Sequence, residues 1–206
     1  TTQLIIHKYV SHNMKKIIAL LILFSFGNLL SQDLKCLNSE FYNSDYDVMQ
    51  VQNSSDSINE IIKSELKSDS LRLVVIPNSY LKFPKWASYK RKGIDSGFKI
   101  ILINNSSNDF SLFNMDGRII MKRQVYYKNK WENVKSYDRT PQPICGNSYF
   151  TKRVIKSRDF FTFIAPCVEG DIKAKFRFVV YVNSETEKPT VYSNEFDGFI
   201  NKKLIE

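Results

Sequence analysis

Histidine is nearly absent from this sequence. Its 206 residues contain only His7 and His12, and both precede the first methionine, Met14. A protein that begins at Met14 therefore lacks the commonest general base, which is also a frequent metal ligand. This absence excludes Ser/His/Asp catalysis, Cys/His catalysis and histidine-metal sites. We predict no metal, no cofactor and no catalytic residue of these kinds.

Glycine and proline are also scarce. The chain has 7 glycines and 6 prolines, and they are spread along its length without forming a glycine-rich phosphate loop or an internal repeat. A nucleotide-binding α/β fold is therefore not expected. No CxxC pair occurs, which argues against thioredoxin-like redox chemistry.

Only one long hydrophobic run is present, at residues 17–30. It follows Lys15 and Lys16 and ends at Ser31-Gln32, the basic, apolar and polar order that is typical of a secretory signal. The run is shorter than the roughly 18 to 20 residues that span a membrane. We predict that residues 14–32 are a removed signal peptide, with an uncleaved anchor as the alternative. Residues 1–13 are then an over-extended start, and the protein is secreted or periplasmic, without a transmembrane segment.

Three cysteines follow the predicted signal: Cys36, Cys145 and Cys167. Export would place them where disulfides persist. We predict a Cys145–Cys167 bond, because closing a loop of about 20 residues stabilises a domain by about 3 kcal/mol in the chain-entropy model. Cys36 is then a free thiol, an intermolecular link, or the partner of one of the others, and spacing alone does not decide among these.

The chain after residue 33 divides into a polar lead-in and a strand-rich domain. Residues 33–55 lack a sustained hydrophobic period and are predicted to lie outside the core. A capping-box pattern followed by spaced isoleucines predicts a short helix near 57–67. The lead-in is assigned to residues 33–70 and the strand-rich domain to residues 71–206.

Short apolar runs separated by Asn, Gly, Ser and Asp predict seven or eight antiparallel strands. The clearest is 172–182, where apolar and polar residues alternate. Residues 118–128 and 131–135 are expected to form a hairpin across Asn129-Lys130, although Arg123 interrupts its apolar face. The other candidates are 71–76, which ends at Pro77, and 98–103, 110–113, 149–155, 160–164 and 190–196. This pattern predicts a mainly β, antiparallel β-sandwich, with a barrel as the alternative.

Four segments carry a family resemblance: Phe98-Lys-Ile-Ile-Leu-Ile-Asn104, Trp131, Gly170-Asp-Ile-Lys-Ala-Lys-Phe-Arg-Phe178 and Tyr192-Ser-Asn-Glu-Phe196. Residues 95–200 resemble the immunoglobulin-like domains of small exported bacterial proteins of unknown function. They are more distantly similar to the BsuPI-type proteinase-inhibitor domain. The resemblance implies an immunoglobulin-like fold, and no inhibitory loop residue matches.

Outward residues of two strands form the candidate binding face. In an immunoglobulin-like sandwich the strands at 118–128 and 172–182 should be neighbours, so their outward residues would share one surface. These residues are Lys122, Gln124, Tyr126, Lys128, Lys173, Lys175, Arg177 and Tyr181. Basic groups interleaved with tyrosine suit an anionic partner, such as an acidic polysaccharide, an envelope component or extracellular nucleic acid. The alternative is an ordinary lysine-rich solvent face.

The predicted function is therefore an exported, non-catalytic binding or envelope-associated module. The net charge is +9 for the whole chain and +6 after residue 32, because residues 1–32 carry three lysines and no acid. This charge is consistent with an anionic partner but also with simple solubility. Two alternatives remain, a proteinase inhibitor and a carboxylate-based, glycosidase-like hydrolase. A hydrolase would need two opposed acids across a cleft. The candidate acids are Asp116, Glu132, Asp138, Asp159, Glu169 and Asp171.

Overall fold

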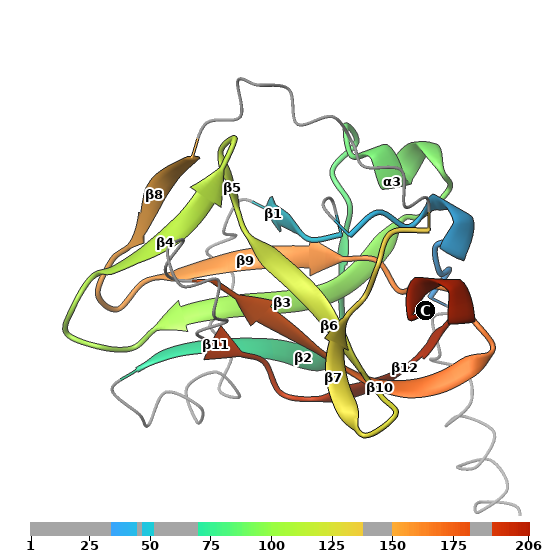
Figure 1. Cartoon of the computed structure of the whole chain (residues 1–206). Coiled ribbons are helices and arrows are strands. Elements are labelled where there is room, and N and C mark those ends of the chain that lie inside the picture. The colour runs from blue at the N-terminus through green and yellow to red at the C-terminus, as the bar shows by residue number, and fades with distance from the viewer. Residues whose placement is uncertain (1–33, 45–46, 52–69, 138–149, 182–190) are drawn as a thin grey trace, which may run out of the picture. The chain divides into compact units, whose positions relative to one another are not determined.

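Three antiparallel sheets form the fold (Figure 1). The structure is a computed structural model, and it describes residues 34–44, 47–51, 70–137, 150–181 and 191–206. The predicted signal peptide and the predicted helix near 57–67 lie outside these ranges. The helical elements of the described ranges are η1 (Ser39–Phe41), α3 (Ser88–Arg91) and η2 (Lys202–Leu204).

The first sheet has four strands in the order β1-β9-β3-β2, and the second has the order β11-β10-β6-β7, with β12 also paired to β10. A smaller sheet has the order β5-β4-β8. The bounds for the first sheet are β1 (Met49–Val51), β9 (Phe160–Ala165), β3 (Ser96–Asn104) and β2 (Leu71–Lys82). Those for the second are β11 (Val191–Tyr192), β10 (Ile172–Val180), β6 (Met121–Tyr127), β7 (Lys130–Asn133) and β12 (Phe196–Ile200). The third sheet contains β5 (Arg118–Ile119), β4 (Phe110–Met115) and β8 (Phe150–Ile155).

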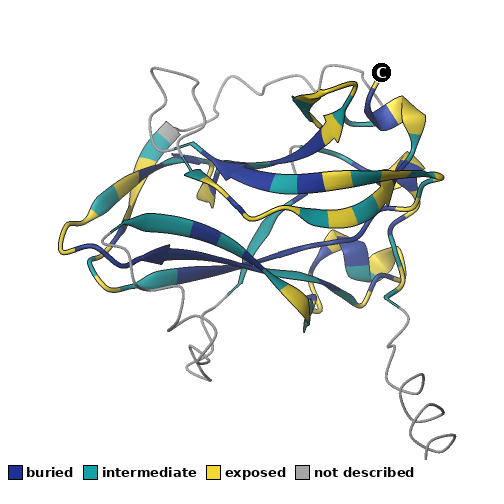
Figure 2. Cartoon of the chain, turned by 90° about the horizontal axis from the view of Figure 1, so that it is seen from below, coloured by how far each residue is buried: buried dark blue, intermediate teal, exposed yellow. Residues whose placement is uncertain are grey.

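The first two sheets are the layers of a β-sandwich (Figure 2). One core cluster joins Ile100 and Phe163 of the first sheet to Phe178 and Val180 of the second. Burial of such apolar side chains is the main favourable contribution to folding. The predicted β-sandwich of antiparallel sheets is confirmed.

Strand β10 follows the predicted alternation from Lys173 to Phe178, but Val179, predicted to face solvent, is fully buried. Phe176, Phe178 and Val180 are buried, while Lys173 and Lys175 are exposed. Successive side chains of a strand point to opposite faces, so the core takes one set and solvent the other.

Two predicted strand boundaries need correction. Strand β2 does not end at Pro77 but continues to Lys82, with a register shift between Val75 and Tyr80. Such an irregularity accommodates Pro77, which has no N–H for the ladder. The predicted strand at 118–128 is divided at Ile120 into β5 and β6.

The hairpin between β6 and β7 turns at Lys128-Asn129, not at Asn129-Lys130. Tyr127 pairs with Lys130, and the φ angles of Lys128 and Asn129 are 48° and 64°. Two positive φ angles are characteristic of a type I′ turn, whose twist matches that of the strands. Each residue of β6 therefore pairs with a residue of β7 two positions earlier than predicted. Because side chains alternate with a period of two, a shift of two leaves each of them on its predicted face.

The lead-in does contribute to the core, so the prediction that it lies outside is wrong. Leu37 and Tyr42 are buried in the same cluster as Phe176, and Asp47 has no exposed surface. Strand β1 then pairs with β9 as an edge strand of the first sheet. The buried residues of this segment are too widely spaced to form a hydrophobic period, which is why pattern analysis missed them.

The disulfide joins Cys36 to Cys167, whose Cα atoms are 4.7 Å apart. The predicted Cys145–Cys167 bond is therefore wrong, and Cys145 lies outside the described residues. A parallel bridge between Leu37 and Val168 brings the two bonded cysteines together, although 131 positions separate them in sequence. The bond attaches the lead-in covalently to the sandwich.

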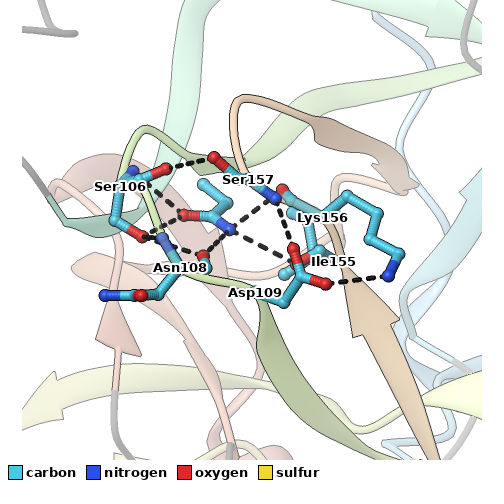
Figure 3. A network of polar contacts seen from close by, with 7 residues as sticks. Ser106, Asn108, Asp109, Ile155, Lys156 and Ser157 are labelled. Atoms are coloured by element: carbon cyan, nitrogen blue, oxygen red, sulfur yellow. Dashed lines mark hydrogen bonds and ion pairs between the residues drawn. The ribbon is translucent and has the colours of Figure 1, made fainter.

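Figure 3 shows a polar network in which Ser106 and Asn108 lie beside Lys156 and Ser157. The buried Asn104 connects the two loops that carry these residues. The Nδ2 group of Asn104 donates to the backbone oxygens of Asn108 at 2.7 Å and Lys156 at 2.9 Å. Its Oδ1 accepts from the backbone N–H and the hydroxyl of Ser106, at 3.0 and 2.8 Å. The fully buried amide thus has partners on both of its polar atoms, as burial requires.

Asp109 extends this network across the same two loops (Figure 3). Its carboxylate accepts from Lys156 Nζ and from the backbone N–H of Ser157, each at 2.8 Å. These hydrogen bonds lower the pKa of Asp109. The polar stretch 104–109, expected only to end a strand, therefore fixes the loop between β3 and β4.

None of the helices in the described ranges has the length and hydrophobicity of a membrane-spanning segment.

Candidate functional site

The candidate site is the outer face of the second sheet, the side that points away from the core. Strand β6 pairs with β10, so that Tyr126 lies opposite Lys175 and Gln124 lies opposite Arg177. The prediction that these two strands are neighbours is confirmed. Directly opposite residues of an antiparallel pair share one face of the sheet, so these four side chains are neighbours on it.

Arg177 lies between two aromatic rings on this face. Its guanidinium carbon is 4.2 Å from the ring centroid of Trp131 and 4.0 Å from that of Tyr192. These distances are well within the range of cation–π attraction. Strands β7 and β11 supply the two rings, so the pairing of four strands fixes this arrangement.

Hydrogen bonds fix the guanidinium further. Arg177 Nε donates to Gln124 Oε1 at 2.9 Å, and Gln124 Nε2 donates to Asn133 Oδ1 at 3.1 Å. Among the described residues, neither Nη1 nor Nη2 of Arg177 has an acceptor within hydrogen-bonding distance. The side chain therefore presents N–H donors in a fixed plane, the geometry that binds carboxylate, sulfate or phosphate with two parallel hydrogen bonds.

The charge of Arg177 persists despite its partial burial. Burial lowers the pKa of this side chain, and the nearby Tyr192 and Glu195 oppose that change. Guanidinium ionises so far above neutral pH that it stays protonated in proteins. The site therefore carries a permanent positive charge against aromatic surface.

Aromatic side chains continue along the same face. Tyr126, Tyr192 and Phe199 are 41%, 43% and 55% exposed. Tyr126 also contacts Trp131, with ring centroids 5.3 Å apart. Phe199 lies opposite Lys173 in the pairing of β12 with β10. Exposed aromatic groups beside cations give a surface that is partly apolar and partly basic.

Acidic residues offset only part of the positive charge. Lys175 lies 3.4 Å from Glu195 and opposite Asp197. Lys122 and Lys173 have no ion pair with any described residue. An exposed ion pair is screened by solvent and contributes little stability, so Lys175 remains accessible to another anion.

Two of the predicted residues, Lys128 and Tyr181, lie one position beyond the ends of β6 and β10. Lys128 lies in the hairpin turn, with its Nζ 3.8 Å from Glu206. Tyr181 follows the end of β10, and its backbone N–H donates to Ile120. The candidate face therefore consists of Lys122, Gln124, Tyr126, Trp131, Lys173, Lys175, Arg177, Tyr192 and Phe199, which we call the basic-aromatic face.

Trp131, Tyr192 and Phe199 were not among the predicted site residues. Trp131 could have been found, because the predicted hairpin already placed it on the same face as Tyr126. Tyr192 belongs to a strand of only two residues. So short a strand has no measurable alternation, and its partner is not evident from sequence.

The inner face of the same strands holds a buried ion pair. Arg123 donates from Nε and from Nη2 to the two carboxylate oxygens of Asp47, each at 2.9 Å. The side chains are 3% and 0% exposed. Arg123 Nη2 also donates to the carbonyl of Pro166. Arg123 interrupts the apolar face of β6 because it connects the lead-in to the second sheet.

Burial and pairing act in opposite directions on Asp47. Burial raises the pKa of this carboxyl, and the adjacent Arg123 guanidinium lowers it. The ionised form therefore depends on Arg123. Because both charges are enclosed and mutually satisfied, this pair has a structural role and is not available to a ligand.

The described cavities are not lined by acids. One of about 570 Å³ lies beside β1, and a smaller one lies beside β5. Neither is lined by an aspartate or glutamate from the described ranges. Among the candidate acids of the hydrolase alternative, Glu132 lies 2.7 Å from Lys130, and Asp138 is outside the described residues. The described residues contain no group of three metal-ligating side chains.

Comparison with known proteins gives no match to any family model, curated protein or solved structure.

Proposed function

We propose that this protein is an exported, non-catalytic binding module that holds an acidic polysaccharide on its basic-aromatic face. The proposal depends on Arg177, whose guanidinium is stacked between the rings of Trp131 and Tyr192. Its Nε is bonded to Gln124, and its Nη1 and Nη2 have no acceptor among the described residues. A fixed guanidinium of this kind selects a planar acid group on a sugar.

The shape of the face supports a polymer more than a small molecule. The aromatic and basic residues come from four strands, β6, β7, β10 and β11, and from β12 beside them. Successive acid groups of a chain would meet Lys122, Arg177 and Lys173 at separate points. The apolar faces of sugar rings would pack against the exposed tyrosines and Phe199, in the way that ligands combine apolar contact with a few oriented polar groups.

Export is part of the same proposal. The basic and apolar segment at residues 14–32 motivates it, and the Cys36–Cys167 disulfide is compatible with an oxidising compartment. The immunoglobulin-like resemblance stays a prediction.

Charge reversal on the face tests the proposal. We expect K173E/K175E/R177E to lose retention on immobilised heparin and on polygalacturonate, because three attractive charges become repulsive. Retention of the wild-type protein should fall as salt is raised, since screening acts over about 8 to 10 Å at ionic strengths near 0.1 M.

A matched variant controls for net charge. K82E/K152E/K202E reverses three exposed lysines outside the face and should keep most of the retention. Equal losses in the two variants would contradict a defined site. Stronger retention on single-stranded DNA than on either polysaccharide would instead assign the face to nucleic acid, whose bases also stack on aromatic side chains.

A further inference from the structure

A second basic cavity lies beside strand β1. Its volume is about 570 Å³, and its lining comes from β1, the segment around α3, the turn between β4 and β5, and strand β8. Pockets that hold small ligands commonly measure about 300 to 1,000 Å³. No residue of the basic-aromatic face lines this cavity, so it is a separate feature.

Three arginines from three distant parts of the sequence line this cavity: Arg91, Arg118 and Arg153. No aspartate or glutamate of the described ranges is in the lining. Arg91 and Arg153 form no ion pair with a described residue. An anion in the cavity would be attracted by the guanidiniums of both Arg91 and Arg153.

Strand β8 directs only one of its basic residues to the cavity. Arg153 lines the cavity, with its guanidinium carbon 5.1 Å from the ring centroid of Phe161, whereas the neighbouring Lys152 does not line it. The ring supports the guanidinium by cation–π contact. Arg153 is thus positioned by packing on the sandwich.

The remaining lining is largely apolar. Val48, Met49 and Val51 contribute from β1 and the residue before it, and Trp86 lies at the cavity with 71% of its surface exposed. An exposed tryptophan beside arginines offers a stacking surface for an apolar or aromatic group. A purely inorganic anion would leave this part of the cavity without contacts.

We infer that this cavity binds a small organic ligand that carries two or more anionic groups and an apolar part. The guanidiniums of Arg91, Arg118 and Arg153 contact the anionic groups, which suit their planar donors. Trp86 and the apolar residues of β1 contact the rest of the ligand.

Calorimetric titration of the purified protein with naphthalene-1,5-disulfonate tests this inference. We expect saturable binding at one site, and R91Q/R118Q/R153Q should weaken it by at least about tenfold. W86A should weaken it by about threefold, and sodium sulfate should bind more weakly than the disulfonate because it lacks the apolar part.

The matched variant K82Q/K152Q/K202Q removes the same net charge from outside the cavity and should bind the disulfonate as the wild-type protein does. The face variant K173E/K175E/R177E should also keep disulfonate binding, which separates this inference from the proposed polysaccharide site. Equal weakening in the cavity and matched variants, or the absence of saturable binding, would overturn the assignment. Equal affinity for sulfate would overturn the role of the apolar lining.

Discussion

Arg123 and Arg177 occupy opposite faces of the same strand pair, and they differ in whether a carboxylate within the fold neutralises their charge. Arg123 is on the inner face of β6, opposite Phe178, while Arg177 is on the outer face of β10, opposite Gln124. Both guanidiniums lie over aromatic rings. Arg123 has a carboxylate bound to its Nε and Nη2, whereas neither Nη1 nor Nη2 of Arg177 has an acceptor among the described residues.

The difference shows that neither residue type nor cation–π stacking identifies a binding site. Arg123 is enclosed with Asp47, so its charge is satisfied within the fold. Removing one partner of such a pair leaves a buried, uncompensated charge, whereas removing an exposed cation leaves nothing unsatisfied. Variants of the two arginines should therefore separate stability from binding.

The largest loss of stability is expected from D47A. It leaves the buried guanidinium of Arg123 without its carboxylate and should lower the free energy of unfolding by about 3 to 5 kcal/mol. Urea denaturation monitored by circular dichroism measures this change. The exposed Asp171 provides a matched control, because D171A should change stability by less than about 0.5 kcal/mol. A loss in D47A no larger than in D171A would contradict the structural role of the pair.

Removing the other partner should make stability depend on pH. In R123M, the buried Asp47 keeps the desolvation that raises its pKa and loses the cation that lowers it. The folded state then binds the proton more tightly than the unfolded chain, so its stability falls as pH rises above about 4, the ordinary carboxyl range. The difference in unfolding free energy between R123M and wild type should be larger at pH 7 than at pH 4. A difference independent of pH would show that Asp47 does not titrate in this way.

Loss of the disulfide should have a comparable or somewhat smaller effect. The double variant C36S/C167S should lose about 2 to 5 kcal/mol, because the bond restricts a long loop in the unfolded chain. Peptide mapping without reduction should recover residue 36 linked to residue 167 in the wild-type protein. A fragment that links Cys145 to Cys167 instead would contradict the observed pairing.

A smaller loss is expected at the loop network. N104A removes the buried amide that bonds to Ser106, Asn108 and Lys156, and it should cost about 2 to 3 kcal/mol because several backbone groups lose their partner. Thermal unfolding measures the effect. N108A is the matched control, because Asn108 contributes its backbone oxygen to this network, so its melting temperature should change little.

The sequence predicts the local parts of this architecture and misses those that depend on distant contacts. Alternation along 172–182 was enough to place Arg177, Lys175 and Lys173 on the outer face of β10. The pairing of β10 with β6 followed from an expected sandwich topology. The first inference rests on the two-residue period of a strand, which is a local property. The second rests on the strand order expected of an immunoglobulin-like sandwich.

The failures share a cause. Asp47 and Arg123 lie 76 positions apart, and Cys36 and Cys167 lie 131 apart, so no local pattern connects either pair. The predicted Cys145–Cys167 bond favoured the shorter loop, whereas tertiary structure brought Cys36 to Cys167. The lead-in was assigned outside the core for the same reason. Its few buried residues contact residues that are distant in sequence, so no local pattern shows that they are buried.

A small effect on stability and a large effect on binding are both expected from R177Q. Titration of this variant with polygalacturonate, beside the wild-type protein at the same low salt, tests whether Arg177 holds the polymer. We expect at least about tenfold weaker binding, with an unfolding free energy within about 1 kcal/mol of the wild type. Unchanged affinity in a fully folded R177Q protein would contradict the assignment of the basic-aromatic face.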